Sequence, residues 1–254
     1  MGYIRMTMDG SVAALTLDRG VTNPINLDLV AELSDALEEI TSREEIRGVT
    51  LGSANDKFFS IGFDIPELYP LDRDGFKAFY QAFNRLCVAL YALPKPVVAA
   101  LTGHAVAGGC IVALACDYRF IAAGRKLMGL NEIKLGVPIP YPADCMLHDL
   151  VGTRTAREFT DTGDFFEADD LLARGAVDRV LPLDAVRGES LAWCRQLADA
   201  PGTSFARIKS NRTERVTAPI MRHLAEKEAQ FVESWYAEET RRQLREAMEN
   251  FRGR

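Results

Sequence analysis

Hydrophobic residues recur along the chain with two different spacings. Residues 11–18 (SVAALTLD) and 46–53 (IRGVTLGS) are short runs rich in strand-forming residues, which indicates two β-strands. Between them, residues 28–42 (DLVAELSDALEEITS) repeat apolar positions at the spacing of one helix face. The first part of the chain therefore predicts a strand, a helix and a second strand, in that order.

The same alternation recurs between residues 85 and 123. Residues 85–94 (RLCVALYALP) predict a helix and residues 95–103 (KPVVAALTG) a strand; a buried helix at 108–117 (GGCIVALACD) and a strand at 118–123 (YRFIAA) follow. Strands that alternate with helices form βαβ units, in which parallel strands are covered by helices. We therefore predict an α/β core over residues 1–190.

The chain changes character after about residue 190. Residues 189–200 (ESLAWCRQLADA) and the segment from Pro219 to Phe251 are charged and helical in period, with a break at 200–202 (APG) between them. We predict a C-terminal helical region at residues 191–254. Helix-rich tails commonly bury an apolar stripe on a neighbour, so a cap or an oligomer contact is favoured over a direct catalytic role.

Composition narrows the class of protein. The 254 residues are 48% hydrophobic and 26% charged, as in a globular protein with one principal domain. A net charge of -6 provides no overall field that would draw the protein to nucleic acid or anionic lipid. The most apolar region, residues 97–123, contains His104, Asp117 and Arg119, which favours a buried core over a membrane span.

The N-terminus and the cysteines suggest a compartment. The first ten residues (MGYIRMTMDG) lack the pattern of a secretory signal. The five cysteines have no paired CxxC spacing, which fits reduced thiols in a cytoplasmic protein. The three histidines are not at metal-ligand spacing with one another, so we expect no metal site.

Three glycine-containing segments are candidates for chemistry. In residues 58–68 (FFSIGFDIPEL), Gly62 lets the backbone turn sharply and present N–H groups outward, although this segment by itself favours a plain loop after a strand. In residues 101–117 (LTGHAVAGGCIVALACD), Gly108 and Gly109 stand at the expected start of the buried helix. Free N–H groups there can hold an anion or a developing oxyanion; close helix packing is the alternative. Neither segment carries a nucleotide phosphate-loop motif.

The third segment, residues 128–140 (MGLNEIKLGVPIP), places Glu132 directly after Asn131 in an apolar stretch. Desolvation raises the pKa of an unpaired carboxyl group, which makes Glu132 a candidate proton carrier. From this segment alone, a glutamate turned toward solvent is the favoured alternative.

Four motifs in order resemble one family over essentially the full length of the chain. They are FSIGFDI (59–65), GHAVAGGCIVALACD (103–117), GLNEIKLG (129–136) and EADDLLARGAVDRVLP (167–182). They resemble the crotonase family, also called the enoyl-CoA hydratase/isomerase superfamily. The resemblance implies a spiral of ββα turns and a homotrimer or dimer of trimers. It also implies an acyl-CoA substrate, with coenzyme A as part of the substrate and no prosthetic group.

The resemblance also implies roles for individual residues. The backbone N–H groups of Phe63 and Gly108 would hold the thioester oxygen, and Glu132 would carry the proton. The substrate-binding residues that it implies are Ile61, Gly62, Phe63, Asp64, Ile65, Gly108 and Asn131.

One position separates two activities. Hydratases of the family resemble one another in a pair of glutamates, and the first of those positions is Ile111 here. A single glutamate is enough to move a double bond, so the chain looks closest to the Δ3-Δ2-enoyl-CoA isomerases. Hydration, thioester hydrolysis or dehalogenation, and a noncatalytic acyl-CoA-binding scaffold, are the alternatives.

The segment after Glu132 departs from the family pattern. Residues 139–145 (IPYPADC) stand where the family commonly has Pro-Gly-x-Gly-Gly. We expect the prolines to stiffen this segment and Tyr141 to narrow or polarise the acyl pocket. For Asp144 an N-cap role is favoured over that of a second carboxylate. Candidate partners of the CoA phosphates are Lys57, Lys134 and Lys227, and the sequence gives no reason to prefer one of them.

Overall fold

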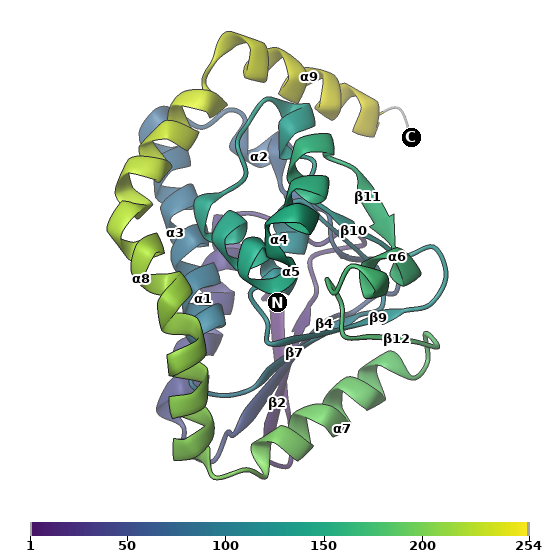
Figure 1. Cartoon of the computed structure of the whole chain (residues 1–254). Helices are drawn as coiled ribbons and strands as arrows, with labels where there is room; N and C mark the ends of the chain where they lie inside the picture. Colours follow the sequence, from purple (N-terminus) through teal and green to yellow (C-terminus); the bar gives the residue numbers. More distant parts are fainter. Residues whose placement is uncertain (1, 253–254) are drawn as a thin grey trace.

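The computed structural model describes residues 2–252 and is built around a six-stranded sheet (Figure 1). Its strands, in spatial order, are β1 (Ile4–Asp9), β2 (Val12–Leu17), β4 (Gly48–Ser53), β7 (Val97–Leu101), β9 (Tyr118–Ala122) and β12 (Arg179–Leu181). β1 and β2 form an antiparallel hairpin, whereas β2, β4, β7, β9 and β12 run parallel. The predicted α/β class with a largely parallel sheet is confirmed.

A second sheet lies beside the first and contains the shorter strands. In spatial order they are β11 (Phe165–Glu167), β10 (Leu127–Gly129), β8 (His104–Val106) and β5 (Phe58–Ser60). β5, β8 and β10 are parallel, and β11 pairs antiparallel with β10. A two-stranded sheet joins β3 (Pro24–Ile25) to β6 (Gly62–Phe63).

The order of these strands along the chain produces a spiral. β4 is followed by β5, β7 by β8 and β9 by β10, so the chain passes from the large sheet to the small sheet three times. After each passage a helix follows: α3 (Arg73–Ala92), α4 (Gly108–Leu114) and α5 (Tyr141–Thr162). This is the spiral of ββα turns that the family resemblance implied.

The helices α1 (Leu27–Ser42) and α3 begin at side-chain caps. Asn26 accepts a hydrogen bond from Leu29 N at 3.0 Å, and Asp72 accepts one from Gly75 N at 2.8 Å. α3 begins well before the predicted residue 85. Phe76 and Phe79 continue its apolar face among the charged and polar residues of its first turns.

The remaining helices are α2 (Ile65–Leu68), a 3₁₀ turn η1 (Glu132–Leu135), α6 (Ala168–Ala173), α7 (Val186–Ala198), α8 (Gly202–Trp235) and α9 (Glu238–Arg252). α7 lies on the large sheet, where Val186, Cys194 and Ala198 pack against its strands. The domain boundary predicted at residue 190 falls within α7 and stays a prediction.

α8 corrects one expectation. It begins at Gly202 rather than at Pro219, which lies inside the helix. A proline lacks a backbone N–H group and usually marks a helix start or a kink, so the sequence favoured a later beginning. Buried residues on both sides of Pro219, including Val216 and Ile220, hold α8 along α3 (Figure 1).

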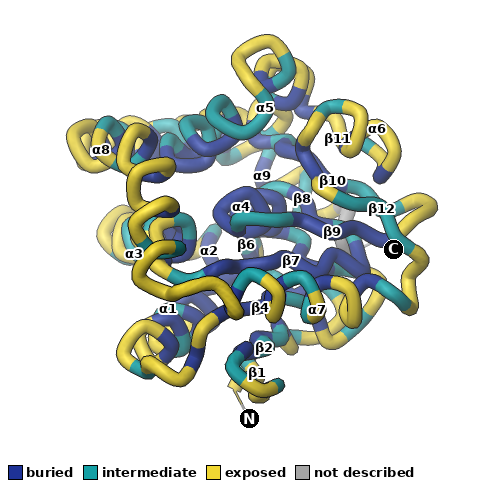
Figure 2. Tube along the Cα trace, turned by 60° about the horizontal axis from the view of Figure 1, so that its bottom comes forward, coloured by how far each residue is buried: buried dark blue, intermediate teal, exposed yellow. Residues whose placement is uncertain are grey.

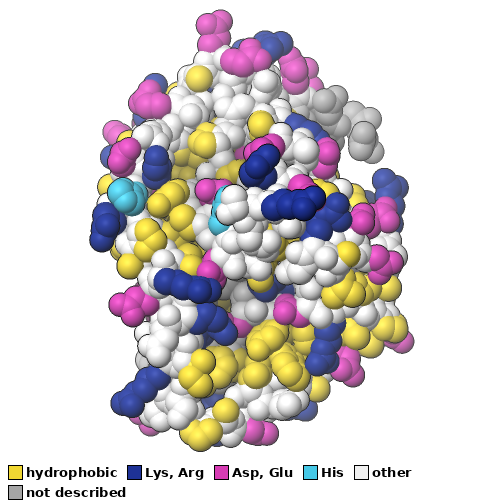
Figure 3. All heavy atoms as spheres, in the orientation of Figure 1, with side chains coloured by type: hydrophobic (Ala, Val, Ile, Leu, Met, Phe, Trp, Pro, Cys, Tyr) yellow, Lys and Arg dark blue, Asp and Glu magenta, His cyan; other side chains and the backbone are white. Residues whose placement is uncertain are grey.

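The buried residues concentrate in the central strands β2, β4, β7 and β9 and in α4, and many exposed residues lie on the outer helices (Figure 2). On the face drawn in Figure 3, acidic and basic side chains are interspersed. Among the described residues, no helix combines the length and the apolar character that a membrane span requires.

Candidate active site

The three candidate segments leave neighbouring strands at the same edge of the small sheet. Ser60 of β5 pairs with Ala105 of β8, and Val106 of β8 pairs with Gly129 of β10, all in parallel register. The carboxyl ends of parallel strands meet at one edge of a sheet. The segments that follow, 61–63, 107–108 and 130–132, therefore start side by side although they are far apart in the sequence.

Glycine permits the first two segments to touch. The backbone of Gly62 has a φ of +96°, and a Cβ atom there would lie 2.8 Å from Gly108 N. A Cβ atom at Gly109 would collide with the carbonyl oxygen of Ser60. Both glycines are thus required for close packing, which brings the loop after β5 against the start of α4.

The two predicted donors lie on these touching segments. Asp64 N donates to Ile25 O at 2.9 Å, and because successive N–H groups of a strand point in opposite directions, the Phe63 N–H group points away from β3. Gly108 is the first residue of α4, where backbone N–H groups have no acceptor within the helix. Ala107, which precedes it, has a φ of 48° and donates its N–H group to Gly129 O at 2.9 Å.

Glu132 begins η1, separated from the end of β10 by two residues, and is buried, with 6% of its surface exposed. Within the described residues its Oε2 atom has no hydrogen-bond partner. Burial raises the pKa of Glu132 from 4.5 to about 7, and the backbone N–H groups of Glu132 and Asn131 oppose that shift only in part. The predicted desolvated carboxyl group is confirmed, and the alternative of a solvent-facing glutamate is wrong.

The carboxyl group of Glu132 lies within electrostatic reach of both neighbouring helices. Burial raises the pKa values of the Cys110 thiol in the first turn of α4 and of the Tyr80 hydroxyl in α3, and the Glu132 charge adds to both shifts. The Glu132 charge therefore acts on groups of both α3 and α4. Ile111, beside Cys110, is 1% exposed and offers no acid or base.

Asp64 has structural contacts that the sequence did not reveal. Its carboxylate caps α2 by accepting from Glu67 N at 3.2 Å and pairs with Arg19 Nη1 at 2.5 Å. Ile65 is the first residue of α2 and packs against the core. The predicted place of Asp64, Ile61, Ile65 and Asn131 among the substrate-binding residues stays a prediction.

The sequence did not reveal that two phenylalanine rings of α3 pack against Phe63. The Phe63 ring packs edge to face against Phe79 at 4.9 Å and Phe83 at 4.8 Å between ring centroids. Both partners lie on the buried face of α3. The helical spacing of these phenylalanines was the available signal, but it does not say which loop they contact.

Ser60 is a second residue that was missed. Its hydroxyl group donates to Asn23 O at 2.7 Å and accepts from Gly62 N at 3.1 Å. Asn23 is fully buried, and its side chain donates to Ser53 Oγ and Phe59 O. These bonds hold the backbone of the loop that carries Phe63.

The C-terminal helix α9 lies over the segments around the site (Figure 1). Thr240 Oγ1 donates to Gly136 O, at the end of η1, at 2.8 Å. Arg241 stacks on the ring of Tyr69 and donates to its carbonyl oxygen at 2.8 Å. The helical region therefore acts as a cap within its own chain; contact with a neighbouring subunit stays a prediction.

The segment after η1 shows that the role predicted for Asp144 was wrong. α5 begins at Tyr141 with Pro140 at the N-cap position, so the predicted N-cap role of Asp144 is wrong. The two prolines start the helix earlier than the carboxylate suggested. Asp144 lies in the first turn, 3.6 Å from His148 Nε2, and burial raises its pKa.

Of the three candidate lysines, Lys134 is paired with Asp164 at 2.6 Å.

Comparison with known proteins gives consistent relatives. A family model described as enoyl-CoA hydratase/isomerase matches residues 7–254. A probable enoyl-CoA hydratase echA17 of Mycolicibacterium paratuberculosis is 31% identical, over 90% of this chain and 88% of that protein. The mitochondrial enoyl-CoA delta isomerase 1 of Homo sapiens is 32% identical, over 75% of this chain and 63% of that protein.

Solved structures extend the comparison. The human mitochondrial delta3-delta2-enoyl-CoA isomerase superposes with a TM-score of 0.95 at 26% identity, covering 99% of this chain and 98% of that one. An enoyl-CoA hydratase from Bacillus halodurans has a TM-score of 0.89 at 18% identity, covering 96% and 99%, which shows a shared fold.

Proposed function

The chain belongs to the enoyl-CoA hydratase/isomerase family, and on that premise we propose that it moves a double bond from the 3 to the 2 position of an enoyl-CoA. The observation that carries this proposal is the buried carboxyl group of Glu132, whose Oε2 atom has no partner among the described residues, with isoleucine at position 111. One group that can both take and return a proton is sufficient for this reaction.

The proposed reaction has two proton transfers. The Glu132 carboxylate removes a proton from C2, and the electron pair delocalises into the thioester to form an enolate. The N–H groups of Phe63 and Gly108 hold the enolate oxygen, each contributing about 3 kcal/mol on the scale of measured oxyanion-hole donors. Protonated Glu132 then returns the proton at C4, and the double bond lies between C2 and C3.

The pKa of Glu132 suits both steps. A carboxyl group with a pKa of about 7 is present in both protonation states near neutral pH, so it serves as base and then as acid. An exposed glutamate near pKa 4.5 would be a weaker base and would rarely hold the proton.

Hydration of a 2-enoyl-CoA is the second candidate, and the names of the mycobacterial relatives favour it. Hydration needs one group to activate water and one to deliver a proton. Ile111 provides neither, and Asp144 lies on α5 beside His148. These contacts support the isomerase over the hydratase.

We further propose that coenzyme A enters only as part of the substrate and that the protein forms a trimer or a dimer of trimers.

The test offers the protein a trans-3-enoyl-CoA and a trans-2-enoyl-CoA separately and follows the absorbance of the conjugated thioester. We expect a rise with the first substrate and little change with the second. A fall with the second and no rise with the first would identify a hydratase. The Glu132→Gln variant is the control, and full activity in that variant would contradict the proposed role of Glu132.

A further inference from the structure

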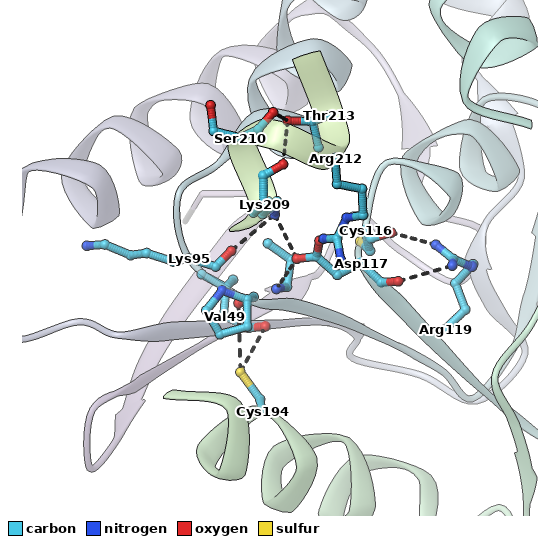
Figure 4. A network of polar contacts seen from close by, with 12 residues as sticks. Val49, Lys95, Cys116, Asp117, Arg119, Cys194, Lys209, Ser210, Arg212 and Thr213 are labelled. Carbon is cyan, nitrogen blue, oxygen red and sulfur yellow. Dashed lines mark hydrogen bonds and ion pairs between the residues drawn. The ribbon is translucent and has the colours of Figure 1, made fainter. Parts of the chain in front are cut away.

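The buried guanidinium group of Arg119 donates hydrogen bonds to backbone carbonyl groups at the C-terminal end of α4 and just beyond it. Its side chain is 2% exposed, and Nη1 donates to the carbonyl oxygens of Ala113 at 3.3 Å and Cys116 at 2.5 Å, with a longer contact to Leu114 at 3.5 Å. Nη2 donates to Asp117 O at 3.2 Å. Figure 4 shows the guanidinium group directed at the backbone of Cys116 and Asp117.

The remaining donors of Arg119 also go mainly to the backbone. Nε donates to Ala176 O at 3.0 Å, and the nearest carboxylate oxygen, that of Asp178, lies 3.6 Å from Nη2. A buried arginine is usually matched by a carboxylate in a two-bond fork. Here the charge faces the last carbonyl groups of a helix, where the partial charge is negative. Arg119 therefore acts as a C-terminal clamp on α4.

A second set of contacts fixes the segment that follows α4. Asp117 Oδ2 accepts from Val97 N at 2.9 Å and pairs with Lys209 Nζ at 2.7 Å, and its Oδ1 pairs with Arg212 (Figure 4). The chain after α4 is thereby tied to β7 and to α8. Arg119 is the group that connects this fixed frame to the carbonyl groups of α4 itself.

The opposite end of α4 is held by backbone contacts, among them the bond from Ala107 N to Gly129 O at 2.9 Å, and not by a side-chain cap. α4 has 7 residues, and its N-cap, Ala107, makes no side-chain hydrogen bond to the helix. Two helical turns move as one unit, so a clamp on the last carbonyl groups also sets the axial position of Gly108. We propose that Arg119 is a positioning residue that holds the Gly108 N–H group against the thioester oxygen; this inference rests on the proposed function.

The test uses Arg119→Lys, which keeps the charge and loses the planar fork. Removal of one oxyanion-hole donor lowers kcat about 100-fold to 1000-fold, so partial displacement of Gly108 should lower kcat at least about tenfold, with KM changed less than about threefold. Leu33→Ala, a core change in α1, is the control. It should lower thermal stability and leave kcat near that of the wild type.

A spectroscopic readout separates this inference from the proposed reaction. A saturated acyl-CoA with a ¹³C-labelled thioester carbonyl binds without isomerisation, and infrared spectra report how strongly the carbonyl is polarised. We expect the wild type and Leu33→Ala to lower the carbonyl frequency of the bound ligand, and Arg119→Lys to lose part of that shift. A wild-type shift without isomerase activity would refute the proposed reaction and leave the role of Arg119 standing.

Arg119→Lys with wild-type kcat and wild-type carbonyl shift would overturn the inference and leave Arg119 a purely structural residue. If Arg119→Lys fails to fold, Asp178→Asn provides the second variant. Asp178 is partly exposed, accepts from Arg119 N at 2.7 Å and lies 3.6 Å from Nη2, so the change to Asn keeps an acceptor for the backbone N–H group and removes the nearest negative charge from the guanidinium group. It should lower kcat about twofold to fivefold and weaken the carbonyl shift; no change in either would also overturn the inference.

Discussion

A Cβ atom on residue 62 would lie 2.8 Å from the backbone nitrogen of Gly108, so these two residues can be neighbours only because residue 62 is glycine. The φ of +96° at Gly62 adds backbone strain for any residue with a side chain. The close approach brings together the two segments that carry the proposed oxyanion donors.

Gly62→Ala should therefore lower kcat by about 100-fold to 1000-fold, the range for loss of one oxyanion donor, and destabilise the fold by about 1–3 kcal/mol. Steady-state kinetics and chemical denaturation measure the two effects. Gly188→Ala is the matched control, because a Cβ atom there meets nothing within 4 Å and the residue lies inside α7. It should keep full activity and gain up to about 1 kcal/mol of stability.

The activity should depend on the ionisation of Glu132. The carboxylate is the reactive form in the first step, and its pKa is about 7 in the folded protein. We expect kcat/KM on a 3-enoyl-CoA to rise with pH and to reach half its maximum near pH 7, since kcat/KM reports the free enzyme. A midpoint near 4.5 would contradict a desolvated Glu132 as the base.

The same shift predicts how stability depends on pH. The pKa of Glu132 is raised from 4.5 to about 7 on folding, so between these values the folded state binds more protons than the unfolded state. Wild-type stability is therefore lowered as pH rises through this window. Glu132→Gln has no carboxyl group to ionise and escapes this loss. Its free energy of unfolding, compared with that of the wild type, should therefore rise by up to roughly 3 kcal/mol between pH 4 and pH 8.5, at about 1.4 kcal/mol per unit of pKa. Urea denaturation at both pH values measures this difference, and equal changes for both proteins would refute it.

The parts of the fold that depend on local spacing were predictable from the sequence, and the parts that depend on distant pairing were not. The apolar runs at 11–18 and 46–53 contain β2 and β4, because strand patterning is visible within a few residues. The pairing of β5, β8 and β10 joins segments more than twenty residues apart, so periodicity alone did not reveal the small sheet. Only the resemblance to a family implied it.

The candidate site divides in the same way. The apolar neighbours of Glu132 in sequence made it a candidate for desolvation but left a solvent-facing glutamate open, and the tertiary packing that leaves only 6% of its surface exposed decides between the two. The partners of Phe63 and Arg119 are set by tertiary packing, so Phe79 and the carbonyl groups of α4 were not identified in advance. The N-cap prediction for Asp144 failed because Pro140 and Tyr141 begin the helix first.

The two contacts of Asp64 distinguish a structural role from a substrate-binding role. Asn keeps the N-cap hydrogen bond to Glu67 N and loses the ion pair with Arg19, whereas Ala loses both. We expect Asp64→Asn to keep KM for the acyl-CoA within about twofold of the wild type. Asp64→Ala should lose about 1–3 kcal/mol of stability, because the Arg19 side chain is only 12% exposed and its guanidinium group is left with fewer partners. A tenfold rise of KM in Asp64→Asn would instead favour direct substrate binding.

The hydrogen bond from Thr240 to Gly136 O ties α9 to the end of η1, the turn that begins with Glu132. We expect this contact to contribute to the burial of Glu132. Thr240→Val preserves the shape of the side chain and removes this bond. Because burial is the main cause of the raised pKa of Glu132, looser packing of α9 should lower that pKa and move the midpoint of the pH profile of kcat/KM below that of the wild type. Thr213→Val is the matched control: Thr213 is also buried in a helix, but its hydroxyl group bonds to Lys209 O within α8. Its midpoint should not move, and an unchanged midpoint in Thr240→Val would mean that α9 does not control the desolvation of Glu132.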